Sequence, residues 1–268
     1  MTGANQVSKG MTLTERAKLG GLRRVKLYGN PGTAEGRSKG GKKTVQFFHL
    51  NPALAKTIGF VMRKEINYPE RSPELAELIG IMLGDGGLPG NHQLTISFNY
   101  LTDKDYSRYI CSIFEKLFSI GCSIHKRKNS NGADVVVNSS NLVDFLVKQG
   151  LVTGNKTRNQ ADIPSWIKGR AEYQIACLRG LVDTDGGLYT HKYRSNGKYY
   201  RYAKLCFTNH SGPLLNSVLT ILTGLNFKAY LGDHHVSIYA ASEVRRYFRE
   251  VGSHNLKHVT KFERHFAN

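Results

Sequence analysis

Acidic residues are scarce in this 268-residue sequence, where 20 Asp and Glu stand against 38 Lys and Arg and give a formal net charge of +18. A surplus of that size is typical of proteins that bind a polyanion, with nucleic acid favoured over an anionic membrane. No apolar run approaches the roughly 18 residues that span a bilayer, and the N-terminus lacks the apolar segment of a signal peptide. We therefore expect an intracellular protein, in the cytoplasm, nucleoid or an organelle matrix, that is neither secreted nor membrane-bound.

Cysteine is also scarce, and the four in the chain are Cys111, Cys122, Cys177 and Cys206. They form no Cys-x-x-Cys pair, and none has a histidine at zinc-ligand spacing. We expect buried thiols in a reducing compartment rather than a disulfide framework. Hydrophobic residues make up 40% of the chain, which is enough for one large or two small domains with real cores.

Residues 1–45 hold a large share of the positive charge, with ten Lys and Arg against two Glu. Gly-Gly precedes a basic cluster twice, in AKLGGLRRV (17–25) and RSKGGKKTV (37–45). We predict a basic, Gly-rich arm that orders on a phosphate backbone, with a disordered solubilising tail as the alternative. The arm residues expected to contact DNA are Arg23, Arg24, Lys39, Lys42 and Lys43. Apolar content rises over residues 46–71, which predicts a connecting helical segment docked onto the main body.

From residue 72 the chain shows one pattern twice. Hydrophobic spacing first predicts a helix ending at Gly86-Gly87, and then, in order, a strand over 93–100, a helix over 105–118, strands over 123–128 and 133–139, and a helix over 140–150. The second half predicts a helix ending at Asp185, followed by a strand over 199–207, a helix over 214–225, a hairpin over 227–240 and a helix over 242–252. We therefore predict two repeats, residues 72–160 and 161–268, related by a pseudo-twofold axis.

Two matching stretches place an aspartate where helix physics disfavours it: LIGIMLGDGGL (78–88) and LRGLVDTDGGL (178–188). Each stretch reads as the end of a helix that stops at Gly-Gly. Asp85 and Asp185 fall in the last turn, against the negative end of the helix dipole, at a cost of roughly 0.3–1 kcal/mol each. A local rule broken twice in matching context indicates function.

The spacing of small residues suggests what that function is. The small residues four apart on one face of each helix are Gly80, Gly84, Gly180 and Thr184. Such faces let two helix backbones pack closely, which would bring the two aspartates together where the helices end. Two close carboxylates repel unless a cation lies between them, and hard oxygen donors select Mg²⁺ (or Mn²⁺). We predict a metal site formed by Asp85, Asp185, Gly84 and Thr184, and metal-assisted hydrolysis of phosphodiesters.

The stretches LIGIMLGDG (78–86) and LRGLVDTDG (178–186) resemble the two motifs of a single-chain LAGLIDADG homing endonuclease, and the resemblance covers residues 72–268. It implies an α+β fold of two αββαββα repeats packed through their motif helices, each with a curved antiparallel sheet for the DNA major groove. It also implies a monomeric, Mg²⁺-dependent, intron-encoded endonuclease. Such an enzyme hydrolyses both strands of a long asymmetric site in double-stranded DNA across the minor groove and leaves 3′ overhangs.

The resemblance further implies roles for single residues. The metal-binding acid occupies the eighth motif position, here Asp85 and Asp185. The sixth position holds Leu83 in the first motif and Asp183 in the second, and we do not expect Leu83 to inactivate the protein. Further catalytic residues implied by position are Lys156, Lys257, Asn99 and Thr208. Lysines near the scissile phosphates could steer or polarise the attacking water.

Base reading is expected from polar side chains on the outer faces of the strands, where Arg and Lys suit guanine and Gln suits adenine. In the first sheet these are Gln93, Thr95, Ser97, His125, Lys126, Arg127 and Lys128. In the second sheet they are Arg194, Arg201, Tyr202, Lys204, His235, Ser237 and Tyr239.

Two alternatives keep the fold but change the function. An RNA maturase would assist splicing of its own intron RNA and would not need Asp85 or Asp185 for that activity. A catalytically inactive DNA-binding regulator would usually have lost the two acids, which are both present. An intein is not expected, because the chain starts with Met and no splicing blocks flank the core.

Overall fold

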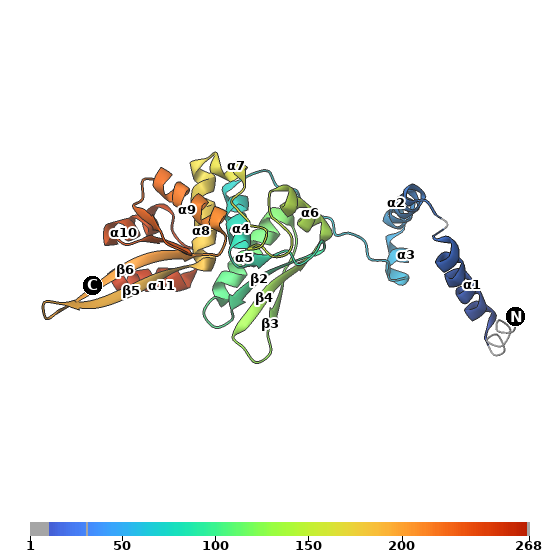
Figure 1. Ribbon diagram of the computed structural model, residues 1–268, viewed down its shortest axis with the longest axis horizontal. Helices are drawn as coiled ribbons and strands as arrows, with labels where there is room; N and C mark the ends of the chain where they lie inside the picture. The colour runs from blue at the N-terminus through green and yellow to red at the C-terminus, as the bar shows by residue number, and fades with distance from the viewer. Residues whose placement is uncertain (1–10, 31, 267–268) are drawn as a thin grey trace. The chain divides into compact units, whose positions relative to one another are not determined.

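The computed structural model describes residues 11–30 and 32–266, and the chain divides into two compact units, Met1–Met62 and Arg63–Asn268 (Figure 1). The helices of the first unit are α1 (Leu13–Tyr28), α2 (Ala34–Leu50) and α3 (Pro52–Thr57). Its described residues bury little: Phe48 and Ala55 are the buried hydrophobic side chains, and the Phe48 ring lies 4.3 Å from that of Phe60. None of the helices in the described ranges combines the length and the apolarity that a bilayer span requires.

The two helices of the basic arm were not predicted from the sequence. Gly-Gly pairs inside α1 and α2 argue against helix, because each glycine costs about 1 kcal/mol relative to alanine. A capping box begins α1, in which Thr12 and Glu15 satisfy each other's backbone amides. Thr33 caps α2 by accepting a hydrogen bond from the Gly36 amide. These two capping threonines are the sequence features that favour helix here. The predicted docking of residues 46–71 onto the main body stays a prediction.

The second unit contains the same sequence of elements twice. The first half consists of α4 (Pro73–Leu83), β1 (Gly86–Gly87), β2 (Gln93–Asn99), α5 (Lys104–Phe118), β3 (Ser123–Lys126), β4 (Gly132–Asn138) and α6 (Ser140–Lys148). After the short α7 (Ser165–Lys168), the second half consists of α8 (Ala171–Asp185), β5 (Gly186–Ser195), β6 (Lys198–Thr208), α9 (Gly212–Gly224), β7 (Ala229–Leu231), β8 (His235–Ile238) and α10 (Ala241–Glu250). The final helix is α11 (Leu256–Phe266).

Each half folds into a four-stranded antiparallel sheet, ordered β1-β2-β4-β3 in the first and β5-β6-β8-β7 in the second. The predicted α+β class with antiparallel sheets is therefore confirmed. The strands β1 and β5 and the helix α11 were missed, because the Gly-Gly pairs were read only as helix stops and β5 has little apolar alternation. Of the four thiols, Cys177 and Cys206 are buried, whereas Cys111 and Cys122 are only partly buried.

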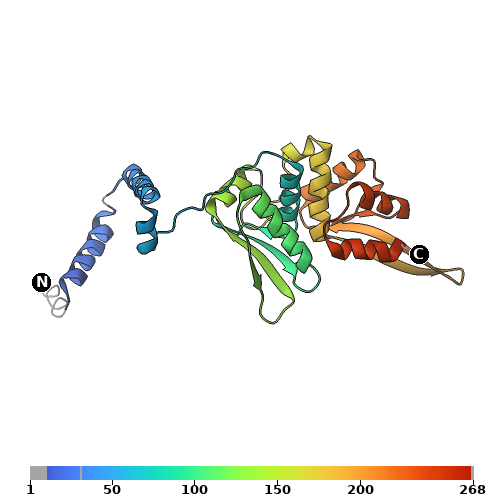
Figure 2. The same cartoon turned by 180° about the vertical axis from the view of Figure 1, so that it is seen from behind.

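Helices α4 and α8 pack side by side between the two sheets (Figures 1 and 2). Every residue of α4 from Leu75 to Leu83 is buried, as expected of a helix with protein on all sides. A Cβ added at Gly80 would collide with the carbonyl oxygen of Cys177 in α8, and one added at Gly180 would collide with that of Glu77 in α4. The two backbones touch where the glycines lie, and this contact sets the positions of the two helix ends.

Candidate active site

Each motif helix delivers one aspartate at its C-terminal end. Gly84 is the C-cap of α4, so Asp85 follows directly, and Asp185 is the last residue of α8. Although part of its side chain is exposed, enclosure by protein and then the charge of Asp185 raise the pKa of Asp85 to about 6. Burial also raises the pKa of Asp185. The arrangement therefore disfavours two negative charges at this point unless a cation compensates them.

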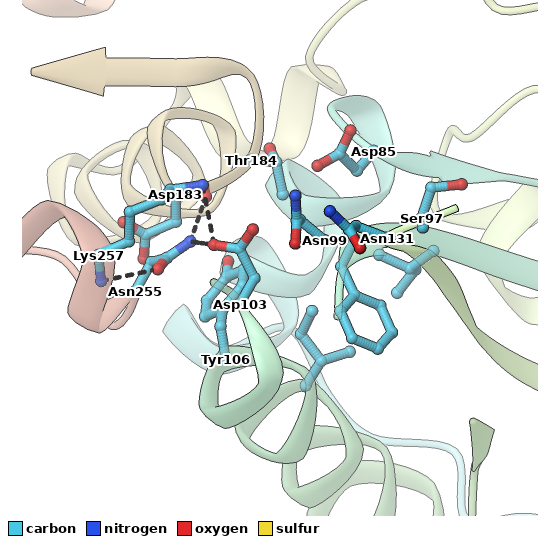
Figure 3. Close-up of a pocket in the computed structure, with 14 residues that line it drawn as sticks. Asp85, Ser97, Asn99, Asp103, Tyr106, Asn131, Asp183, Thr184, Asn255 and Lys257 are labelled. Carbon is cyan, nitrogen blue, oxygen red and sulfur yellow. Dashed lines mark hydrogen bonds and ion pairs between the residues drawn. The ribbon is translucent and has the colours of Figure 1, made fainter. Parts of the chain in front are cut away.

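A cavity of about 280 Å³ opens beside Asp85 (Figure 3). Residues from both halves of the unit line it together with Asp85, and the polar ones are Ser97, Asn99, Asp103, Tyr106, Asn131, Asp183, Thr184, Asn255 and Lys257. In Figure 3 Asp85 lies on one side of the cavity, and Asp103 and Lys257 lie across from it. Asp85 therefore shares its cavity with a lysine of the other half.

A second cavity, of about 390 Å³, opens beside Asp185. Its polar lining residues are again drawn from both halves: Lys156, Thr157, Asp185, Thr208, Asn209, His210 and Ser211. The Asn209 side-chain amide donates a hydrogen bond of 2.8 Å to the Asp185 carboxylate. The molecule thus has two aspartate cavities, one at the end of each motif helix.

Each of the two predicted lysines lines the cavity of the opposite half. Lys156 belongs to the first half but lines the cavity of Asp185, and Lys257 belongs to the second half but lines the cavity of Asp85. Both lysines act electrostatically on Asp85, and Lys156 acts on Asp185. Each cavity is complete only when both halves of the unit are folded together.

Lys156 is bound to the end of helix α4. Its ammonium group donates hydrogen bonds to the carbonyl oxygens of Met82 (3.1 Å), Leu83 (2.9 Å) and Gly84. These are carbonyls that an α-helix leaves unpaired at its C-terminus, where a positive charge is favourable. Burial lowers the pKa of Lys156, and the two aspartates oppose that change. The Gly84 carbonyl, predicted as a metal ligand, is therefore occupied by a lysine here.

Thr184, the other predicted ligand besides the carboxylates, uses its hydroxyl within its own helix. Its hydroxyl donates to the carbonyl oxygens of Gly180 (2.9 Å) and Leu181 (3.0 Å) within α8. A Cβ added at Gly84 would collide with the Thr184 hydroxyl oxygen, so the two residues meet across the helix interface. The structure therefore places Gly84 and Thr184 at the helix interface and on the walls of the two aspartate cavities, and metal ligation by either residue stays a prediction.

Lys257 is held by an acid of the other half. Its ammonium group lies 2.8 Å from the Asp103 carboxylate, which also accepts a hydrogen bond of 3.0 Å from the Asn255 side-chain amide. Burial would raise the pKa of Asp103, but the hydrogen bonds from Lys257 and Asn255 outweigh it and hold this pKa below its ordinary value. The Asp103 charge thus fixes Lys257 on the wall of the Asp85 cavity.

Asp183, at the sixth motif position, anchors the loop that leads into α11, the helix that carries Lys257. Its carboxylate accepts hydrogen bonds from the Ser253 hydroxyl and from the His254 backbone amide at 2.7 Å. Burial raises the pKa of Asp183 to about 7 despite these hydrogen bonds. Leu83 occupies the same motif position in α4 and is buried. The difference between the motifs is therefore structural: one uses a buried acid, and the other uses an apolar side chain.

A buried polar cluster near this loop was not predicted. Glu77, Asp183 and His254 place potential ligand atoms within 4.8 Å of one another. Glu77, however, already accepts hydrogen bonds from Arg179 (2.9 Å) and Tyr109 (2.8 Å) and contacts His254 Nδ1 at 2.6 Å. The guanidinium beside it supplies the compensating charge, so the cluster is a bridge between the two halves. No single-sequence signal pointed to Glu77.

Strand register shows that Asn99 and Thr208, both predicted as catalytic, do not occupy equivalent positions in the two sheets. Gly86 pairs with Ile96, and Gly186 pairs with Phe207, so the residue after each partner is Ser97 in one sheet and Thr208 in the other. Ser97 and Asn99 both line the Asp85 cavity, and Thr208 lines the Asp185 cavity. Choosing residues at the strand ends selects Asn99 and Thr208 instead, because β2 extends three residues beyond Ile96 and β6 only one beyond Phe207.

Most of the predicted DNA-contacting residues of the first sheet lie at its surface, but several are already bonded. Arg127 donates to Asp134 and, at 2.7 Å, to the Ser97 hydroxyl, which itself donates to Asp134. Gln93 donates to Asn138 at 2.8 Å, and the Lys126 ammonium lies 5.0 Å from the Tyr100 ring centre. The remaining predicted residues of this sheet are Thr95, His125 and Lys128, and the last two are exposed.

The second sheet requires two corrections. Ser237 is fully buried, because it lies on an inner strand with Cys206 and Tyr230 opposite it on the two neighbouring strands. Arg194 lies on the same strand face as the buried Leu188 rather than on the predicted outer face, although its own side chain is exposed. The predicted residues that remain available on this sheet are Tyr202, Lys204, His235 and Tyr239.

The Arg201 side chain lies outside the described part of the structure. In the first unit, Arg23, Arg24, Lys39, Lys42 and Lys43 are exposed. Lys39 forms an ion pair of 2.8 Å with Glu35 on the same helix. The positive charge of α1 and α2 therefore lies on their surfaces.

Residues 172–252 match the family model of the LAGLIDADG-like domain. This segment runs from α8 through the second sheet to the end of α10, so the match covers most of the second half of the unit. The resemblance seen in the motif residues is thereby confirmed. In the first half, the same element order and the same strand order accompany the other motif.

Curated relatives match part of the chain. The replication factor C small subunit of Methanocaldococcus jannaschii is 33% identical over 135 residues, which cover 49% of this chain. The glutamine–fructose-6-phosphate aminotransferase of the same organism is 25% identical over 125 residues, or 45% of this chain. The chain spans only 7% and 11% of the lengths of these two relatives.

Solved structures with a similar fold include two meganucleases in complex with DNA. I-SmaMI bound to uncleaveable DNA is 12% identical, with 70% of this chain and 87% of that chain covered and a TM-score of 0.48. The LAGLIDADG meganuclease I-AabMI bound to uncleaved DNA is 11% identical, with 74% and 92% covered and a TM-score of 0.49.

Proposed function

We propose that this protein is a site-specific, double-strand DNA endonuclease that uses a divalent metal ion. The observation that carries the proposal is the pair of aspartate cavities at the touching ends of α4 and α8, each with a lysine from the opposite half. The LAGLIDADG-like domain over residues 172–252 and the net charge of +18 support the same function. Because one chain supplies both cavities, we propose that it acts as an intracellular monomer on an intron-homing target.

The donor set suits a hard divalent cation. Asp85 and Asp185 are oxygen donors whose pKa values are raised, mainly by burial and, for Asp85, also by the charge of Asp185. A cation beside them would relieve that repulsion. When bound, Mg²⁺ (or Mn²⁺) would supply Lewis-acid stabilisation of the charge that develops on the phosphate oxygens. Asp85 and Asp185 would hold the ions, with DNA phosphates and water completing the coordination.

The other lining residues would act on the phosphate and on the attacking water. Lys257 faces Asp85 across its cavity, where its ammonium would attract the scissile phosphate. Asn209 fixes the orientation of the Asp185 carboxylate through its hydrogen bond. Lys156 neutralises the end of α4 and so allows an anionic backbone to approach two carboxylates and two negative helix ends. We propose hydrolysis of one strand at each cavity, across the minor groove, with 3′ overhangs.

The test is cleavage of a plasmid that carries the intronless form of the host gene. In Mg²⁺ the protein should convert the supercoiled plasmid to a single linear product, and sequencing of the ends should show 3′ overhangs. EDTA should abolish the linear product but leave DNA binding, measured by gel shift, intact. Binding without any cleavage across a series of divalent ions would contradict the proposal.

Acid pH should weaken cleavage through proton competition at Asp85. Its pKa of about 6 means that the carboxyl is mainly neutral below that pH, and the proton must leave before a cation binds. The Mg²⁺ concentration for half-maximal cleavage should therefore rise about tenfold for each pH unit below 6 and level off above 7. Cleavage rates across Mg²⁺ titrations at several pH values measure this. A constant half-maximal concentration between pH 5 and 7 would argue against Asp85 as a ligand.

Removal of the first unit should weaken DNA binding in a salt-dependent way. Residues 1–62 contain eleven Lys and Arg against two Glu, a net charge of +9. If they lie on phosphates, deleting them should make the slope of log affinity against log salt shallower by several units, at about 0.9 per phosphate contact. The cleavage position should stay the same, because the second unit holds both aspartates.

A full-length variant separates the effect of the positive charges from the effect of deleting the whole first unit. Glutamine at Arg23, Arg24, Lys42 and Lys43 removes four exposed charges and keeps the helices. This variant should show part of the same change in salt slope. An unchanged slope in both proteins would mean that the first unit is only solvated.

A further inference from the structure

The hairpin β5–β6 extends beyond the sheet to which it belongs. Its two strands pair over ten residues each, from Gly186–Phe207 at the base to Ser195–Lys198 near the turn. Strand β8 pairs only with Leu205–Thr208, so the outer part of the hairpin has no third strand. Figures 1 and 2 show this two-stranded ribbon projecting past the sheet. A two-stranded ribbon is only marginally stable alone. Stability of the sheet therefore does not explain why the ribbon extends so far, and its side chains indicate a function.

One face of the ribbon is aromatic. Register places Tyr193 opposite Tyr200, and His191 opposite Tyr202, on the same face. The rings of Tyr193 and Tyr200 are stacked with centres 5.2 Å apart, and those of His191 and Tyr202 lie 5.1 Å apart. Tyr193 also contacts Tyr202 at 6.0 Å, which joins the four rings into one cluster. We call these four residues the aromatic face.

The rings of this cluster are far from buried. Tyr193 is 45% exposed and Tyr200 is 44% exposed, although each already contacts other rings. Aromatic side chains directly opposite each other stabilise a hairpin, and this would account for one pair of rings in contact across the strands. It does not explain a continuous exposed cluster, since exposed ring surface brings no stability to the hairpin. The open area is therefore available to a ligand.

The charge of the hairpin identifies the class of ligand. Residues 186–208 contain five Lys and Arg and no Asp or Glu. Lys198 and Lys204 lie on the aromatic face, because register pairs them with Ser195 and Tyr189 on either side of the four rings. Aromatic rings next to cations form the pattern that binds unpaired nucleotides, by stacking on bases and attracting the backbone. In a duplex the base faces are covered, and only base edges can be contacted in a groove.

We propose that the aromatic face of the β5–β6 ribbon binds unpaired nucleotides, in single-stranded DNA or RNA, by base stacking. This activity lies beyond the proposed cleavage of double-stranded DNA and does not depend on Asp85 or Asp185. The rings of Tyr193 and Tyr200 provide the stacking surface. Lys198 and Lys204, on the same face, provide attraction to the sugar-phosphate backbone.

The test measures binding of labelled oligonucleotides by fluorescence anisotropy, in EDTA so that no cleavage occurs. The probes are an oligo-dT and an oligo-rU of about 15 nucleotides and a duplex of equal length without a target site. The double variant Tyr193→Val and Tyr200→Val keeps β-branched side chains suited to a strand. It should lose single-strand affinity by about tenfold or more, as expected for loss of base–aromatic stacking, while duplex affinity stays at the parent level.

Three further proteins distinguish stacking from hairpin damage. The double variant Tyr193→Phe and Tyr200→Phe keeps the rings and should bind like the parent. Tyr199→Val, on the opposite face of the same hairpin, should leave single-strand binding unchanged. In Tyr200→Trp, an added single strand should quench the new tryptophan fluorescence, and the duplex should not.

The comparison between probes then identifies the source of the nucleotides. Tighter binding of oligo-rU indicates RNA, and tighter binding of oligo-dT indicates displaced DNA strands. Parent-level single-strand affinity in the Val double variant would overturn the proposal. So would an equal loss for single strand and duplex without quenching of the tryptophan.

Discussion

Asp85→Asn and Asp185→Asn should each abolish the linear product of plasmid cleavage. Asparagine has nearly the same shape but no charge, so it removes the anionic metal ligand and leaves the helix ends in place. Loss of metal stabilisation worth several kcal/mol corresponds to a rate at least about a thousandfold lower. DNA binding should be retained or strengthened, because one negative charge near the phosphates has gone. Gel analysis of plasmid forms and a gel shift on the same protein measure both effects.

A matched control is available for these two variants. Asp105→Asn removes an exposed carboxylate of α5 that pairs with Arg108 at 2.7 Å and lines neither cavity. This variant should cut like the parent. Full linearisation by Asp85→Asn or by Asp185→Asn would remove the basis for a site built from both helices.

The helix ends could be predicted from the sequence because each rests on local chemistry. Gly86-Gly87 and Gly186-Gly187 end the apolar periodicity, and an acid before each pair has no favourable role in a helix. The period-2 alternation over Leu94, Ile96 and Phe98 identified a strand with one buried face, which the structure confirms. Those features involve residues a few positions apart, where sequence spacing determines spatial neighbours.

Long-range partners could not be predicted in the same way. The resemblance implied catalytic roles for Lys156 and Lys257 without assigning either to an aspartate, and each lines the cavity of the other half. Counting residues cannot determine which of two related cavities a loop enters. The prediction that Ser237 contacts DNA was wrong for a related reason. Alternation shows on which strand face a residue lies, but it does not show which neighbours cover that face.

The two motifs solve one physical problem in different ways. Each helix ends in carbonyls that need donors, inside a protein that also has to hold an aspartate there. At α4 the donor is the Lys156 ammonium, at 2.9 Å from the Leu83 carbonyl. At α8 it is the Asn255 amide, at 3.0 Å from the Asp183 carbonyl, on a loop that the Asp183 carboxylate itself anchors. The acid at the sixth motif position of α8 thus anchors a loop, whereas Leu83 at the same position of α4 is a buried apolar side chain.

Gly80→Leu and Gly180→Leu should each lower the melting temperature and suppress cleavage, although neither residue lines a cavity. An added Cβ already collides with the carbonyl oxygen of Cys177 or of Glu77, and backbone cannot move aside as a side chain can. Overpacking of this kind costs roughly 1–3 kcal/mol, occasionally more. That corresponds to a fall of about 2–4 °C in melting temperature for each kcal/mol in a domain of this size.

The same substitutions should affect catalysis beyond their effect on stability. Moving α4 away from α8 separates Asp85 from Asp185, and a misplacement of about 1 Å at a catalytic group can lower a rate a hundredfold. Cleavage should therefore be measured well below the melting temperature of each variant. Gly20→Leu is the control, because no described atom outside its own helix turn lies within 4 Å of a Cβ added there. If both interface variants melt and cut like Gly20→Leu, contact between the two backbones does not set the distance between the aspartates.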